Sequence, residues 1–111
     1  IIICTFAADM EKQSHSFITL FHYSVEADSE KEGKRALKPV VSQCRAFADA
    51  MQIHFHDDCF LFLDGHATIR LVFQVKESQD VILLKMAQLF TFAHTFKLTL
   101  INNEFFTEKT P

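Results

Sequence analysis

The stretch Cys59 to Lys76, CFLFLDGHATIRLVFQVK, decides the fold, because two runs of β-branched and aromatic residues flank the pair Asp64-Gly65. A type I′ turn needs positive φ at both central residues, and Asp-Gly tolerates this, so the stretch predicts an antiparallel hairpin. Counted outward from the turn, the predicted register pairs Leu63 with His66, Phe62 with Ala67, Phe60 with Ile69, and Asp58 with Leu71.

Alternation along the hairpin predicts one buried face and one mixed face, since successive strand residues point to opposite sides of a sheet. The face expected in the core holds Phe60, Phe62, Ala67, Ile69, Leu71, Phe73 and Val75. The mixed face, which could meet water, a partner or a second subunit, holds Cys59, Leu61, Leu63, Thr68, Arg70, Val72 and Gln74.

Length and composition indicate one globular domain. The 111 residues are 49% hydrophobic, with 13 Phe and only two Gly and two Pro, which excludes disordered and low-complexity classes. We therefore expect residues 1–111 to form a single domain, with 1–15 as an N-terminal extension or edge strand and 107–111 as a tail.

Charge and cysteine content narrow the partners and the compartment. The net charge is −3 and no dense Lys/Arg block occurs, which makes a nucleic-acid partner an unfavourable hypothesis. Three cysteines, Cys4, Cys44 and Cys59, lack CxxC spacing and are typical of reduced thiols, so we expect a cytoplasmic protein. No run approaches the roughly 18 apolar residues of a membrane span, so no membrane partner is expected.

Four further elements follow from periodicity and capping signals. Residues 16–26 are apolar on both sides and predict a central strand. A helix is expected from Ser29, which has capping-box spacing to Glu32, to about Gln52. Pro39 predicts either a kink or a restart of that helix. The stripe that this helix should bury is Leu37, Val40, Val41, Cys44, Phe47, Ala48 and Met51.

The C-terminal third predicts a second helix and a final strand. The helix begins near Ser78 and is apolar over most of its circumference. Residues 96–101 alternate as a strand, and Asn102-Asn103 predicts a turn into a short terminal hairpin. The polar strip expected on the helix consists of Lys85, Gln88, Thr91 and His94.

The element order is strand, helix, strand, strand, helix, strand. This predicts an α+β fold, the ferredoxin-like βαββαβ sandwich, with an antiparallel sheet, two helices on one face and a possible extra N-terminal strand. Runs 16–26 and 67–76 are the most apolar on both sides, as the central strands of that fold should be. A topology this widely shared carries no function of its own.

The cluster His54, His56 and Asp58 is the candidate metal site. On a strand these side chains share one face, and two imidazoles with a carboxylate suit a transition metal such as zinc. The competing interpretation is a polar junction between helix and strand, and we favour it because His-X-His is a short motif that occurs by chance. The leading expectation is therefore a protein without a cofactor.

Catalytic candidates are weak. Cys59 lies beside His56, but the neighbouring carboxylates of Asp57 and Asp58 oppose a negatively charged thiolate, and no glycine-rich loop accompanies them. The sheet also lacks the basic-Gly-aromatic pattern by which RNA-recognition sheets stack bases. We assign no catalytic residue, and the pattern favours a protein that is not an enzyme.

The remaining signal is an excess of hydrophobic residues over what one core would bury. A monomer exposing the second helix, the mixed hairpin face and the C-terminal phenylalanines would carry an unusually large apolar patch. We therefore expect a protein–protein interaction module, most simply a homodimer or one subunit of a small complex. The expected interface residues are Leu61, Leu63, Val72, Leu84, Phe92, Phe105 and Phe106.

Overall fold

The computed structural model describes residues 14–108, and these form an α+β fold with a four-stranded antiparallel sheet and two helices. The elements are β1 (Ser14–Glu26), α2 (Glu30–Met51), β2 (His54–Leu63), β3 (His66–Glu77), α3 (Gln79–Thr95) and β4 (Thr99–Glu108). Of the N-terminal extension or edge strand expected over residues 1–15, residues 1–13 lie outside the described residues. Two boundaries were wrong: Ser14 and His15 belong to β1, and Thr107 and Glu108 belong to β4.

The strands lie in the order β2-β3-β1-β4, so β1 and β3 are central and β2 and β4 are the edges. β1 pairs with β3 along its whole length and with β4 on its other side. The prediction that runs 16–26 and 67–76 occupy the centre of the sheet is confirmed.

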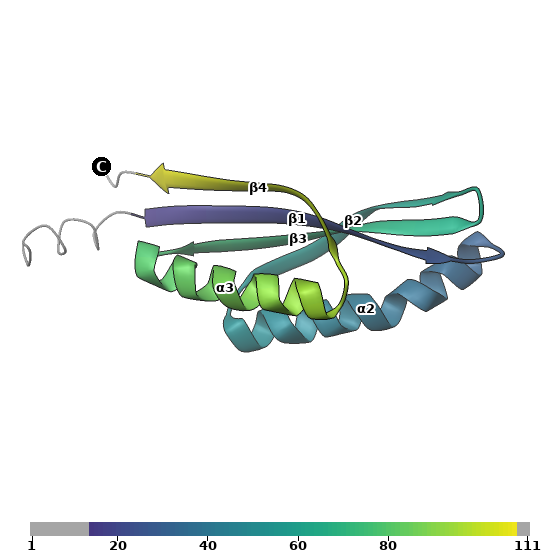
Figure 1. Cartoon of the computed structure of the whole chain (residues 1–111), viewed down its shortest axis with the longest axis horizontal. Helices are drawn as coiled ribbons and strands as arrows, with labels where there is room; N and C mark the ends of the chain where they lie inside the picture. The colour runs from purple at the N-terminus through teal and green to yellow at the C-terminus, as the bar shows by residue number, and fades with distance from the viewer. Residues whose placement is uncertain (1–13, 109–111) are drawn as a thin grey trace, which may run out of the picture.

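Both helices lie against one face of the sheet (Figure 1). α2 packs chiefly on β2, β3 and β1, whereas α3 packs on β1 and β3. Between helices and sheet, Phe21 and Phe73 meet edge to face with ring centroids 5.9 Å apart, and both are fully buried. Burying a side chain of this size stabilises the fold by roughly 1.5–3 kcal/mol. The expected core face is confirmed: Ala67, Ile69, Leu71, Phe73 and Val75 are buried, and Phe60 and Phe62 pack against them.

The hairpin turns at Asp64-Gly65 with the predicted pairs Leu63–His66 and Phe62–Ala67. Further from the turn the predicted register was wrong, because Asp58 pairs with Arg70 and not with Leu71. The cause is a β-bulge between Asp58 and Leu61, where Cys59 adopts φ 52°. One extra residue in β2 shifts every earlier pair by one position.

Helix α2 begins where expected. The Ser29 side chain accepts a hydrogen bond from the Glu32 N–H at 3.2 Å. The helix continues through Pro39, so a restart there was wrong. Pro39 lies on the exposed side, where water can reach the carbonyl that loses its intrahelical partner. Every residue of the predicted stripe is buried or half-buried.

Helix α3 departs from prediction at Lys85. The sequence places this lysine on the polar strip, but it is buried, and its Nζ donates to the Gln52 carbonyl oxygen at 3.0 Å. Gln52 caps α2, which has no basic residue in its own last turn. A cation at a helix C-terminus is favourable, so Lys85 supplies from α3 the charge that α2 lacks.

The predicted turn at Asn102-Asn103 was wrong. β4 starts at Thr99, later than the expected Phe96, and continues unbroken to Glu108 along β1. Ile101 is the extra residue where the register shifts, and the Thr19 hydroxyl donates to the Asn102 carbonyl at 3.4 Å. Pairing with the 13-residue β1 therefore overrides the local turn preference of the asparagines.

Candidate functional site

The candidate site is the outer edge of β4. Within residues 14–108, β4 pairs with β1 alone, so its outward backbone groups form an edge that can accept another strand. This strand also holds four large apolar side chains that are 42–49% exposed. We call these residues, Leu100, Ile101, Phe105 and Phe106, the β4 edge.

Contacts with β1 hold the C-terminal half of this edge in place. The ring of Phe105 stacks on His15 with centroids 5.5 Å apart and planes at 24°. Thr107 Oγ1 lies 3.3 Å from His15 Nδ1, and His15 is itself buried. The imidazole thus anchors one side of Phe105, while nearly half of that residue's surface stays open to solvent.

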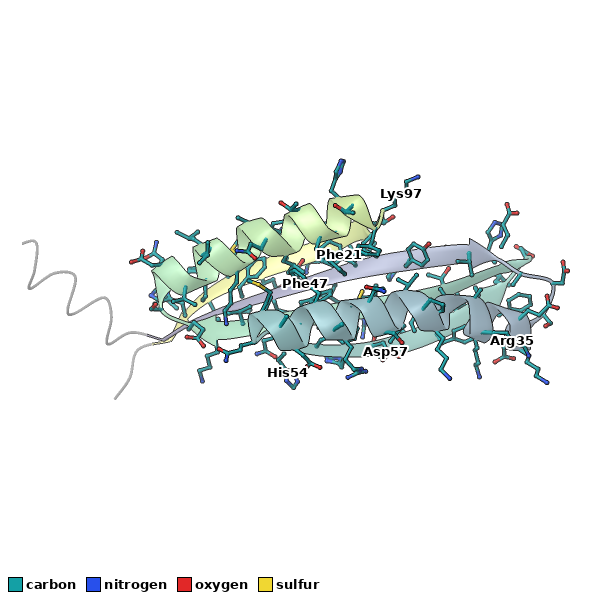
Figure 2. All side chains as sticks on the ribbon, turned by 90° about the horizontal axis from the view of Figure 1, so that it is seen from below. Phe21, Arg35, Phe47, His54, Asp57 and Lys97 are labelled. Carbon is teal, nitrogen blue, oxygen red and sulfur yellow. The ribbon has the colours of Figure 1, made fainter. Side chains whose placement is uncertain are left out.

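The residues predicted for an interface lie on several surfaces. Leu61 and Leu63 are exposed on β2, Leu84 is exposed on α3, and Phe105 and Phe106 are on β4. The other two of the seven are less exposed: Val72 is buried and Phe92 is half-buried. Val72 is 8% exposed within the sheet. Phe92 stacks at 4.3 Å on Phe47, which Figure 2 shows between the two helices.

Sequence reasoning missed Leu100 and Ile101. The segment FKLTLI predicted a strand, but the supposed turn at Asn102-Asn103 concealed that this strand continues to the phenylalanines. Residues 99–106, TLINNEFF, do not alternate, so the grouping of Leu100 and Ile101 with Phe105 and Phe106 comes from the pairing of β4 with β1 and not from a local pattern.

The candidate metal residues share one side of β2, as predicted. The His54 and His56 ring centroids are 6.4 Å apart, and His56 Nε2 lies 3.4 Å from Asp58 Oδ2. Arg70 occupies both carboxylate oxygens of Asp58, with Nε at 2.6 Å from Oδ1 and Nη2 at 3.0 Å from Oδ2. Over residues 14–108 no group of three or more His, Cys, Asp or Glu side chains is arranged to hold a metal ion.

Arg70 sets the electrostatics of this cluster. Its hydrogen bonds to Asp58, with a smaller contribution from its charge, lower the pKa of that carboxyl. A bidentate guanidinium–carboxylate pair is geometrically specific. Asp58 is therefore a carboxylate already engaged in fixing β2 to β3.

The two described cysteines differ in their surroundings. Cys44 is a buried residue of α2, and burial raises the pKa of its thiol to about 12. Cys59 is exposed at the bulge, and both are free thiols. A nucleophilic cysteine needs a thiolate, so Cys44 is inert at neutral pH.

Comparisons with known proteins give no family. No protein-family model matches the chain, and no curated protein matches it. Among solved structures the chain is similar to a de novo designed protein, Foldit4, with 12% identity and a TM-score of 0.37, covering 89% of this chain and 99% of that one. A likeness this distant carries no argument. No helix within residues 14–108 has the length and hydropathy of a membrane-spanning segment.

Proposed function

We propose that this chain is a non-enzymatic protein–protein interaction module that forms a homodimer through the β4 edge. One observation carries the proposal: a ten-residue edge strand holds four large apolar side chains at 42–49% exposure. Addition of a strand to such an edge gives main-chain hydrogen bonds and buries apolar side chains together.

A second copy is the partner that the strand itself fits. In antiparallel self-pairing, residues that oppose each other must face the same side of the sheet, so the twofold axis lies between two copies of one residue. An axis at Asn103 brings Phe105 opposite Ile101 and Glu104 opposite Asn102, whereas the register shift at Ile101 leaves Leu100 on the other side of the sheet from Phe106. Apolar side chains then meet apolar ones, and the Asn102 amide can donate to the Glu104 carboxylate. An axis at Glu104 would oppose two carboxylates, which is destabilising.

Light scattering after size-exclusion chromatography tests the proposal. We expect the wild-type chain to elute as a dimer at micromolar concentration and Phe106→Lys as a monomer, because a lysine on an edge strand blocks edge-to-edge pairing. A wild-type chain that remains monomeric up to about 100 μM would contradict the proposal.

Two matched variants locate the contact. Leu63→Lys changes a more exposed apolar residue on the opposite edge strand, and Leu84→Lys changes one on α3. Both should remain dimers with dissociation constants within about twofold of wild type, since substitutions outside an interface are close to neutral. A monomeric Leu84→Lys would instead assign the interface to α3.

The alternative function is small-ligand or metal binding by His54, His56 and Asp58. The observation in its favour is that the three side chains lie together on one side of β2, with His56 3.4 Å from Asp58. Because Arg70 competes for the carboxylate, Arg70→Gln should strengthen zinc binding in calorimetric titration of untagged protein. His54→Ala/His56→Ala should abolish it, and absence of zinc binding in both wild type and Arg70→Gln would end this alternative.

We further infer a ferredoxin-like architecture and a cytoplasmic location. The element order β-α-β-β-α-β and the central positions of β1 and β3 support the first. The free thiols of Cys44 and Cys59 support a reducing compartment.

A further inference from the structure

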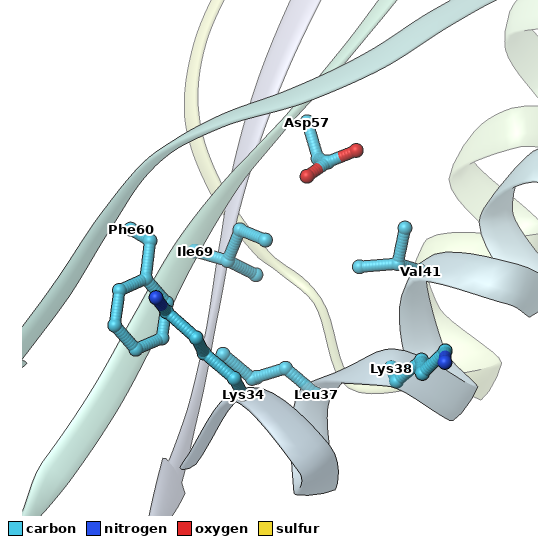
Figure 3. Close-up of a pocket in the computed structure, with 7 residues that line it drawn as sticks. All are labelled: Lys34, Leu37, Lys38, Val41, Asp57, Phe60 and Ile69. Carbon is cyan, nitrogen blue, oxygen red and sulfur yellow. The ribbon is translucent and has the colours of Figure 1, made fainter. Parts of the chain in front are cut away.

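A cavity lies between α2 and the hairpin, well away from the β4 edge in the order of the sheet (Figure 3). Its volume is about 280 Å³. α2 contributes one face, with side chains at steps of three and four, and β2 and β3 contribute the opposite wall. The lining residues are Lys34, Leu37, Lys38, Val41, Asp57, Phe60 and Ile69.

The bulge in β2 sets the spacing of two side chains that line the cavity. On the helix side of a regular strand, side chains recur every second residue. Here Asp57 and Phe60 both reach that side although they are three positions apart, because Cys59 with φ 52° adds one residue between them. The open space lies between Asp57 and Phe60 of β2, Ile69 of β3 and Val41 of α2.

The polar groups around this cavity carry a net positive charge. The Asp57 carboxylate is matched by Arg45, whose Nη2 lies 3.5 Å from Oδ1. Lys34 Nζ lies 5.2 Å from the Phe60 ring centroid and 3.5 Å from Glu30. Lys38 forms no ion pair with any residue in the described range 14–108. The rim thus holds two lysines and one arginine-paired carboxylate around an apolar floor of Leu37, Val41 and Ile69.

We propose that this cavity binds a small monocarboxylate with an apolar body. The carboxylate would lie at Lys38 and Lys34, and the body would rest on the apolar floor beside Phe60. A dry cavity of about 150 Å³ holds benzene, so this one has room for about ten to twelve non-hydrogen atoms. Small-ligand sites commonly combine an apolar lining with a few charged groups that fix orientation.

Three ligands of the same shape test the charge argument: 4-phenylbutyrate, 4-phenylbutan-1-ol and 4-phenylbutylamine. Each is titrated into ¹⁵N-labelled wild-type protein. We expect the carboxylate to shift the amides of Val41, Phe60 and Ile69 with a dissociation constant of about 2 mM, the affinity reached at about 0.3 kcal/mol per non-hydrogen atom. The alcohol should bind at least fivefold more weakly and the amine more weakly still. Equal binding of alcohol and carboxylate, or unshifted cavity amides at 10 mM carboxylate, would overturn the proposal.

Two variants and a control complete the test. Lys38→Glu should weaken phenylbutyrate binding at least fivefold, whereas Lys31→Glu, on the same helix but outside the cavity, should leave it within twofold. Val41→Phe fills the space and should abolish the shifts at Phe60 and Ile69. Circular dichroism shows whether each variant retains the fold. Tight binding by folded Val41→Phe, or equal weakening by Lys31→Glu, would contradict the assignment.

Discussion

The two edge strands of the sheet are built differently. β2 carries His54, His56, Asp57 and Asp58, and its carboxylates meet arginines from α2 and β3. β4 has Glu104 as its one charged residue between Thr99 and Thr107, and its apolar side chains are exposed. Charged edges resist pairing with another chain, whereas apolar edges invite it. β2 is therefore an edge strand protected against pairing with another chain, and β4 is an edge strand available for it.

A bulge is not the feature that separates the edges, because both strands have one. The two edge strands differ instead in their charge and in whether a helix packs on them. α2 packs on β2, whereas β4 is not among the strands on which either helix chiefly packs. Association through one edge closes a dimer, and association through both edges would build an open-ended assembly.

The largest expected effect comes from making β2 resemble β4. Replacing His54, His56, Asp58 and Arg70 with valine removes the charges from the face of the β2–β3 hairpin that points away from the helices. We expect the dimer to grow into assemblies of many copies, because β2 would then pair as β4 does. Light scattering at micromolar concentration checks this. The same replacement combined with Phe106→Lys should stop at a dimer formed through β2, and large assemblies of that combined variant would show that edge pairing is not the cause.

Gly33→Leu tests how α2 packs on the β2 side of the sheet. We expect this substitution to lower the stability of the fold. A Cβ at Gly33 would lie 2.5 Å from the Ala67 Cβ of β3, so a side chain there must push the helix from the sheet. We expect the free energy of unfolding in urea to fall by about 1–3 kcal/mol.

Ala36→Leu is the matched control for that substitution. Ala36 is exposed on the same helix, and its replacement should change stability by less than about 0.5 kcal/mol. Equal losses for the two variants would mean that the approach of Gly33 to Ala67 does not hold α2 in place.

A smaller, pH-dependent effect is expected from Asp58→Asn. Arg70 lowers the pKa of Asp58 from its ordinary value of 3.8, so the folded state binds that proton more weakly than the unfolded state. The pair therefore stabilises the fold above about pH 4 and loses its contribution as pH falls through the lowered pKa. The urea midpoint of Asp58→Asn should lie slightly below wild type at pH 7, and the difference should shrink toward pH 2. A difference that persists unchanged at pH 2 would contradict this assignment.

Much of the fold is predictable from local signals. Asp64-Gly65 placed the turn, Ser29 placed the start of α2, and two-sided hydrophobicity placed β1 and β3 in the middle of the sheet. These features depend on neighbours in the sequence or on total burial, and both are visible in the residues themselves.

The errors share a different origin. The bulge at Cys59 depends on pairing with β3, and the buried Lys85 and the continuation of β4 through Asn102 each depend on a partner distant in sequence. Lys85 is buried because the end of α2 offers it a carbonyl oxygen, and Asn102 remains in a strand because β1 is long enough to pair with it. Residue preferences alone give no such information.

For the same reason, only two of the four residues of the β4 edge were predicted from the sequence. Phe105 and Phe106 stood out as surplus hydrophobics, but their grouping with Leu100 and Ile101 required the knowledge that β4 is an edge strand. The cavity beside Lys38 was not predicted, since its lining comes from α2, β2 and β3, which only the folded chain brings together.

Hydrogen exchange measured at two protein concentrations tests the central claim most directly, namely that β4 and not β2 is the pairing edge. As the concentration rises from about 1 μM to 200 μM, the β4 amides that point away from β1 should gain protection of tenfold or more, while the outward amides of β2 stay unchanged. Exchange in β4 that is independent of concentration, or a concentration-dependent gain of protection in β2, would contradict the account.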